Sequence, residues 1–204
     1  DNAMFLVYLT IVPGLAYIFL SVETGLEEHI RTYLGAVNGE ATWTQLEKTR
    51  VALGRFIADR LRTLILVQGT LSIVVAGMGP QILAALGASY TQVGIFRIGV
   101  LAAFFHVLIL FLAAVFTYLD LRRVNVTLQG LLVVLSAFGT ALSLQFGFAS
   151  YGLGYLVATM VVWVAAYLWL RRVVNNLPYY SFVVVNAANA RSDRRGPNLA
   201  VGKW

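Results

Sequence analysis

The chain of 204 residues is 59% hydrophobic and only 12% charged, with a formal net charge of +6. A soluble domain carries about 25% charged residues, so this composition excludes an ordinary globular protein with a single core in water. The absence of cysteine excludes disulfides, thiolate metal sites and cysteine nucleophiles. We therefore predict an all-α, polytopic transmembrane helical bundle.

Five apolar segments follow one another along the chain, each apolar enough to cross a hydrocarbon layer of about 30 Å as a helix. The last two have no charged residue between them, and we divide them at the glycine-rich segment 147–154. The predicted spans cover about residues 3–22, 64–79, 98–119, 124–146 and 153–170.

The first predicted span contains Pro13 followed by Gly14 near its middle. Proline cannot bond to the carbonyl four residues earlier, so it kinks a helix. Such a kink either shapes the packing of the bundle or serves as a bending point during transport. Pro13 and Gly14 are therefore the hinge candidates.

The polar segment 24–61 is patterned as two amphipathic helices. On the first of these, Leu26, Ile30 and Leu34 recur at helical spacing. We expect a helical hairpin at the membrane surface. It is either a solvated connector or a docking surface for cytoplasmic proteins, with these three residues as the docking candidates. At the other end of the chain, we expect the basic tail 183–204 to be disordered.

The basic residues predict an orientation. Every lysine and arginine except Arg97 falls in the first polar loop (residues 23–62), in the loop after the third span or in the C-terminal segment, all on one side of the predicted bundle. Because basic loops stay in the cytoplasm, we predict a cytoplasmic C-terminus and a periplasmic N-terminal end. A chain whose N-terminal end is periplasmic but which has no signal sequence is expected to be the C-terminal portion of a longer protein.

Few polar side chains lie in the predicted spans, and each is a candidate for contact with a substrate because polar groups are costly at membrane depth. Arg97 either reaches lipid phosphates or forms the outer mouth of a path. His106 is either a hydrogen-bonded core residue or a proton relay, and its spacing from Arg97 places the two on opposite sides of their helix. The glutamines are explained equally by hydrogen bonds between helices. The substrate-path candidates are Arg97, His106, Gln68, Gln129 and Gln145.

Two further patterns concern the surfaces of the spans. A strip of small residues on the fourth span predicts a packing face; it consists of Ser136, Gly139, Thr140 and Ser143. Aromatic residues near the span ends fit either a belt at the membrane interface or a surface that stacks on sugars. These aromatic residues are Tyr118, Tyr151, Tyr155, Trp163 and Trp169.

The sequence indicates no catalytic, cofactor or metal site. It contains no GxxxxGK[ST], HExxH or GxSxG motif, and its carboxylates lie outside the apolar segments. We therefore expect no enzyme activity and no nucleic-acid partner. Passage of a substrate through the membrane, or anchoring of another protein to it, is the function that this composition allows.

An ordered set of short segments resembles the PelG family of Pel exopolysaccharide transporters. The set runs from Pro13 through Phe96-Arg97-Ile98, Tyr118–Arg123 and Tyr151–Tyr155 to Tyr180-Ser181-Phe182, over about residues 4–182. In the family pattern an acidic residue follows the Phe-Arg-hydrophobic triplet, where this chain has Gly99. The family in turn resembles flippases of the multidrug/oligosaccharidyl-lipid/polysaccharide superfamily.

The resemblance implies the C-terminal portion of a transporter in the bacterial inner membrane. It would export the Pel polysaccharide during biofilm formation, with membrane lipid, a cytoplasmic glycosyltransferase and other Pel membrane subunits as partners. The alternative is a non-transporting membrane scaffold that anchors the glycosyltransferase.

Overall fold

The computed structural model of the protein describes residues 2–21, 25–38, 43–85, 87, 92–145 and 150–194, and in these ranges it contains helices and no strand. In chain order the helices are α1 (Asn2–Leu9), α2 (Val12–Ser21), α3 (Glu27–Asn38), α4 (Trp43–Gly77), α5 (Gly79–Ala85), α6 (Gln92–Tyr118), α7 (Arg122–Gln145) and α8 (Leu153–Arg194). Four of them, α4, α6, α7 and α8, are long and apolar enough to cross a membrane, and Phe5–Ser21 is a shorter apolar helical segment. The predicted all-α membrane bundle is confirmed.

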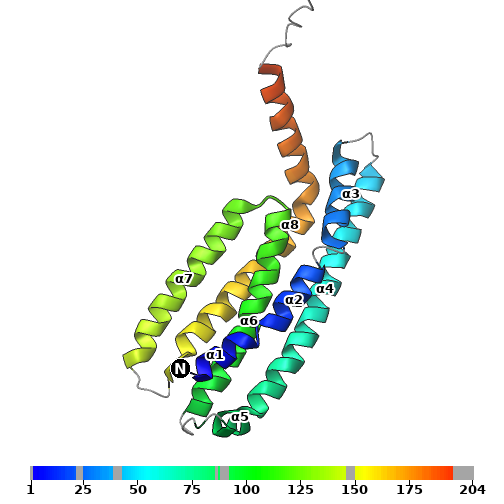
Figure 1. Ribbon diagram of the computed structural model, residues 1–204. Coiled ribbons are helices and arrows are strands. Elements are labelled where there is room, and N and C mark those ends of the chain that lie inside the picture. The colour runs from blue at the N-terminus through cyan, green and yellow to red at the C-terminus, as the bar shows by residue number, and fades with distance from the viewer. Residues whose placement is uncertain are drawn as a thin grey trace, which may run out of the picture.

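The centre of the bundle is α6, which packs against α1, α2, α4, α5, α7 and α8 (Figure 1). Its sequence is apolar on every face, which is the pattern of a helix surrounded by protein. Val100, Val107, Leu112, Val115 and Phe116 have no exposed surface at all. By contrast, α7 forms one edge of the bundle and turns Val126, Val133 and Phe138 outward, as contact with acyl chains requires.

The first predicted span is two helices rather than one, because α1 ends at Leu9 and α2 begins at Val12. Between them the amide of Thr10 bonds to the carbonyl of Val7, three residues back, at 3.2 Å. Leu9 is the residue whose carbonyl Pro13 cannot bind. Pro13 itself lies in the first turn of α2, where its missing amide hydrogen costs least. The proline therefore accompanies a break in the helix, whereas the sequence predicted a kink.

The structure differs from the prediction at the boundary between the hairpin and the second span, because α4 runs through both without interruption. No glycine or proline occurs between Phe56 and Gln68, and a change from charged to apolar residues does not end a helix. With 35 residues, α4 is about 52 Å long at 1.5 Å per residue. Since this exceeds the hydrocarbon thickness of about 30 Å, its charged N-terminal half extends beyond the apolar bundle.

Alongside that half of α4 stands α3, which runs antiparallel to it and does not lie flat across the bundle (Figure 1). Leu26 and Ile30 are buried in one core cluster with Leu53 and Ile57 of α4, whereas Leu34 is exposed. Of the three docking candidates only Leu34 lies on an exposed face, because α4 of the same chain covers Leu26 and Ile30. The predicted start of the hairpin at residue 24 and its turn at 39–42 lie outside the described residues.

A tight turn joins α6 to α7. Asp120 has a φ of 55°, the left-handed conformation that usually selects glycine. The amide of Leu121 bonds to the carbonyl of Phe116 at 2.9 Å, and that of Asp120 to the carbonyl of Thr117 at 3.1 Å. This pair of bonds is a Schellman motif. Aspartate tolerates the conformation because its short polar side chain bonds locally, here to Nε of Arg122 at 2.8 Å.

The last helix, α8, begins at Leu153 as predicted for the fifth span but continues to Arg194. The prediction that the tail is disordered from residue 183 is therefore wrong for 183–194, while 195–204 lie outside the described residues. Residues 183–190 contain three alanines and no glycine or proline, a composition that allows a helix to continue.

Candidate functional site

A buried hydrogen bond joins the break between α1 and α2 to the middle of α4. Gln68 has no exposed surface, and its Nε2 donates to the carbonyl oxygen of Thr10 at 2.8 Å. Side chains of neighbouring helices can satisfy backbone groups that an interrupted membrane helix leaves without partners. Gln68 has this role at the break.

Gly14 allows α2 to approach α4 and α6 at the same place. A Cβ added at Gly14 would lie 2.5 Å from Cγ1 of Val107 and 2.8 Å from Oε1 of Gln68, so any larger residue would displace one of them. Pro13 and Thr10 also border a cavity of about 230 Å³. The hinge candidates and Gln68, which were predicted separately, are thus parts of one site.

Two buried oxygen atoms at this site have no hydrogen-bond partner among the described residues, Oε1 of Gln68 and Oγ of Ser72, one turn further along α4. An unpaired buried polar atom costs about 1–3 kcal/mol. Such atoms favour any arrangement in which they gain a partner or water. Ser72 was missed in the sequence because a serine on an apolar helix gives no signal of its own.

His106 points to α8. Its Nδ1 lies 2.8 Å from the hydroxyl oxygen of Tyr155, and the two groups form a hydrogen bond. Arg97 is exposed and points to the end of α4, where its Nε donates to the carbonyl oxygen of Ala76 at 3.1 Å. The two path candidates on α6 therefore contact different helices, in agreement with their spacing.

The remaining path candidates, Gln129 and Gln145, are on α7. Gln129 is half-buried and Gln145 is exposed at the end of the helix. Neither borders the cavity beside Pro13 or a second, larger cavity that is bordered by Tyr155. The structure therefore brings together Gln68, Pro13 and Gly14 but not the two glutamines of α7.

That larger cavity, of about 730 Å³, lies between α1, α6, α7 and α8. On α7 it is bordered by Ser136, Thr140 and Ser143, which belong to the small-residue strip. Gly139 of the same strip lies against the backbone of α8, since a Cβ there would be 2.8 Å from the carbonyl oxygen of Gly154. The strip thus provides a close helix contact, as predicted, and also one wall of a cavity, which was not predicted.

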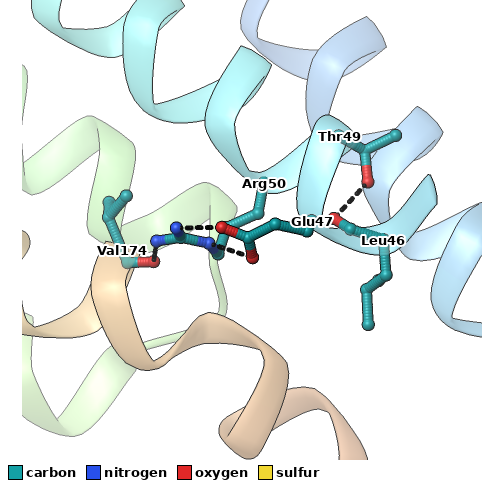
Figure 2. A network of polar contacts seen from close by, with 5 residues as sticks. All are labelled: Leu46, Glu47, Thr49, Arg50 and Val174. Carbon is teal, nitrogen blue, oxygen red and sulfur yellow. Dashed lines mark hydrogen bonds and ion pairs between the residues drawn. The ribbon is translucent and has the colours of Figure 1, made fainter. Parts of the chain in front are cut away.

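Outside the apolar part of the bundle, a polar network joins α4 to α8 (Figure 2). Arg50 donates to both carboxylate oxygens of Glu47, at 2.5 and 2.8 Å, and to the carbonyl oxygen of Val174 at 3.1 Å. These bonds from Arg50 hold the pKa of the Glu47 carboxyl below its ordinary value of 4.5. They also raise the pKa of Arg50 itself, which stays charged.

Apolar helices long enough to cross a membrane, a broken helix bridged by a buried amide and, among the described residues, a buried interior without charged side chains together define a polytopic membrane protein. The model of the protein family PelG, described as "Putative exopolysaccharide Exporter (EPS-E)", matches residues 1–182. The chain belongs to the PelG family, which confirms the resemblance found in the sequence. No curated protein and no solved structure matches it.

Proposed function

We propose that the chain is part of a bacterial inner-membrane transporter that moves the Pel polysaccharide out of the cytoplasm during biofilm formation. Family membership supports export of an exopolysaccharide, and the apolar helices support a multi-pass membrane protein. The basic hairpin and the C-terminal end of the chain are cytoplasmic in this proposal, and the N-terminal end is periplasmic. The chain itself performs no bond chemistry.

The observation that carries a transport mechanism is the break between α1 and α2, bridged by Gln68. Because the regular hydrogen bonds of the helix are already interrupted there, α1 and α2 can change the angle between them without breaking many further backbone hydrogen bonds. The bond from Gln68 to Thr10 stabilises the present angle, whereas the unpaired oxygens of Gln68 and Ser72 favour a different one. Alternating access then proceeds by bending at this break.

The energy for export comes from an ion gradient or from polymer synthesis in this proposal, since the sequence contains no nucleotide-binding motif. Synthesis would couple directly to export through a cytoplasmic glycosyltransferase held near the hairpin. The exposed side chain of Leu34 on α3 is available for that contact.

The substitution Gln68→Leu tests the mechanism. It keeps the volume of the side chain but removes the bond to Thr10, so we expect polymer secretion to fall by about fivefold, the equivalent of one hydrogen bond of about 1 kcal/mol. The matched control is Gln129→Leu, on the half-buried side of α7, which should secrete normally. Copurification of the other membrane subunits should be unchanged in both variants. Normal secretion by Gln68→Leu would contradict the proposal.

One observation favours the scaffold alternative, because α3, the N-terminal half of α4 and the C-terminal half of α8 project together beyond the apolar bundle (Figure 1). A scaffold should tolerate Gln68→Leu, Arg97→Ala and His106→Ala. It should instead lose its glycosyltransferase when the exposed face of α3 is changed by Leu34→Glu. Copurification of the glycosyltransferase and secretion of the polymer, measured in the same strains, separate the two functions.

A further inference from the structure

The cavity between α1, α6, α7 and α8 has the size of a binding site. Its volume is about 730 Å³, within the range of about 300–1,000 Å³ that is usual for small-molecule sites. Each of the four helices contributes to its wall, so a change in the position of α1 would change its shape. The break at Thr10 lies directly after the part of α1 that borders the cavity.

Three tyrosines border this cavity: Tyr8 from α1, Tyr151 from the turn before α8, and Tyr155 from the first turn of α8. A tyrosine ring combines a broad apolar face with a hydroxyl at its edge. Pyranose rings have the matching surfaces, since their C–H groups form an apolar face and their hydroxyls lie around the rim. Tyr155 is held in place by its 2.8 Å bond to His106, which fixes one of the aromatic walls.

The wall formed by α7 carries hydroxyl groups at helical spacing. Oγ of Ser143 donates to the carbonyl of Thr140 at 2.9 Å, and Oγ of Ser136 donates to the carbonyl of Val133 at 3.1 Å. A hydroxyl whose hydrogen is engaged still offers its oxygen lone pairs to a ligand. This wall can therefore accept hydrogen bonds from sugar hydroxyls.

None of the residues that border the cavity carries a charge. A carboxylate or an ammonium group would find no counter-ion there, and charged groups without a partner are costly in such surroundings. A lipid acyl chain would fit the apolar part of the wall but has no group that could hydrogen-bond to the hydroxyl oxygens of the wall. We propose that this cavity binds an uncharged pyranose unit of the exported polymer, an inference that rests on the proposed export function.

Site-directed labelling tests the inference in the intact membrane-embedded protein. The sequence has no cysteine, so Thr140→Cys introduces a single thiol in this chain, on the wall of the cavity. The probes are fragments of the polymer that the strain secretes, released by partial acid hydrolysis and separated by ion exchange into neutral and charged fractions. The readout is the rate at which a water-soluble methanethiosulfonate reagent modifies the thiol.

We expect the neutral fraction to slow modification and the charged fraction to leave it unchanged. Adding Tyr155→Phe to the labelled variant should raise the concentration of neutral fragments needed for protection by about two- to tenfold, through loss of one hydroxyl. The matched control, Tyr118→Phe, alters an exposed tyrosine at the end of α6 that does not border the cavity. It should leave protection unchanged, and the unfolding temperatures of both variants should agree.

Protection by the charged fraction alone would overturn the uncharged ligand. A thiol that the reagent does not reach, or that neither fraction protects, would overturn the cavity as a sugar site and would favour occupation by lipid. Two bulky substitutions give a second test. Thr140→Trp fills the cavity and should reduce secretion, while Gly130→Trp, at a position on α7 where an added Cβ meets no atom within 4 Å, should not. The Gln68→Leu experiment tests the export mechanism independently, so sugar binding in the cavity can be disproved while the proposed export function still holds.

Discussion

The two helices α6 and α7 are both apolar enough to cross a membrane, but their surroundings in the bundle are opposite. In the most apolar part of α6, 50% of the residues are buried, against 17% in α7. The mean hydropathy of that part is 2.7 for α6 and 1.7 for α7. Since lipid tails are as apolar as leucine, hydrophobicity does not decide which face of such a helix meets protein. Small residues and polar contacts between helices decide which faces pack together, and they therefore determine the arrangement of the bundle.

This comparison predicts the largest difference in stability for leucines on the two helices. Leu112 of α6 has no exposed surface and Leu131 of α7 is 38% exposed. We expect Leu112→Ala to lower the free energy of unfolding by about 2 kcal/mol, the lower end of the usual range. The loss is at this end because in the unfolded state the leucine side chain is surrounded by lipid rather than by water. Leu131→Ala should cost less than about 0.5 kcal/mol. Unfolding of the purified protein in mixed micelles measures both, and equal losses would contradict the assignment of α6 as the core.

Two glycines of α7 sharpen the comparison within one helix. Gly139 lies against the backbone of Gly154, which cannot move aside as a side chain would, whereas Gly130 faces open space. Gly139→Ala should therefore cost about 1–2 kcal/mol. Gly130→Ala should be neutral or slightly stabilising, because alanine favours a helix more than glycine does. If the two variants unfold alike in the same micelles, the close contact between α7 and α8 is absent.

The smallest effect concerns the network outside the apolar bundle. Because Arg50 lowers the pKa of Glu47 in the folded protein, the pair contributes stability that is fully present above pH 4.5 and is lost as the pH falls through the lowered pKa. We expect the protection of amides near Val174 of α8 against hydrogen exchange, measured relative to the intrinsic exchange rate at each pH, to fall below pH 4.5. In Glu47→Gln this acid dependence should disappear, and Glu28→Gln, at an exposed position of α3, is the control that should keep it. An identical pH profile in wild type and Glu47→Gln would show that the pair of Glu47 and Arg50 does not stabilise the contact with α8.

Much of the fold could be predicted from the sequence because hydropathy and chain punctuation act locally. The glycine-rich segment 147–154 divided two spans correctly, since α7 ends at Gln145 and α8 begins at Leu153. The length of α4 could not be read in this way. A helix continues through a change of polarity when no residue breaks it, so the predicted boundary near residue 62 had no physical cause.

The contacts of the site were less predictable, because they join residues far apart in the chain. Gln68 was recognised as a costly polar group, but its partner is a backbone carbonyl of Thr10, which carries no side-chain signal. Tyr155, the partner of His106, was noted only as one of several aromatic residues. Leu26 and Ile30 show the same limit, because the sequence does not indicate which element they contact. Their stripe correctly indicated a buried face, but an amphipathic pattern does not tell which element covers it.

The central claim is that α1 and α2 change their angle at Thr10 during export. In a chain without cysteine, Phe5→Cys and Phe19→Cys place two spin labels on outward positions, one in each helix, where the side chains are 71% and 68% exposed. Pulsed electron spin resonance then measures the distance between the labels in membranes, at rest and while polymer is being made. We predict two distances whose proportions shift with synthesis, and a shift toward one of them in Gln68→Leu. A single distance that stays the same in every condition would contradict the account.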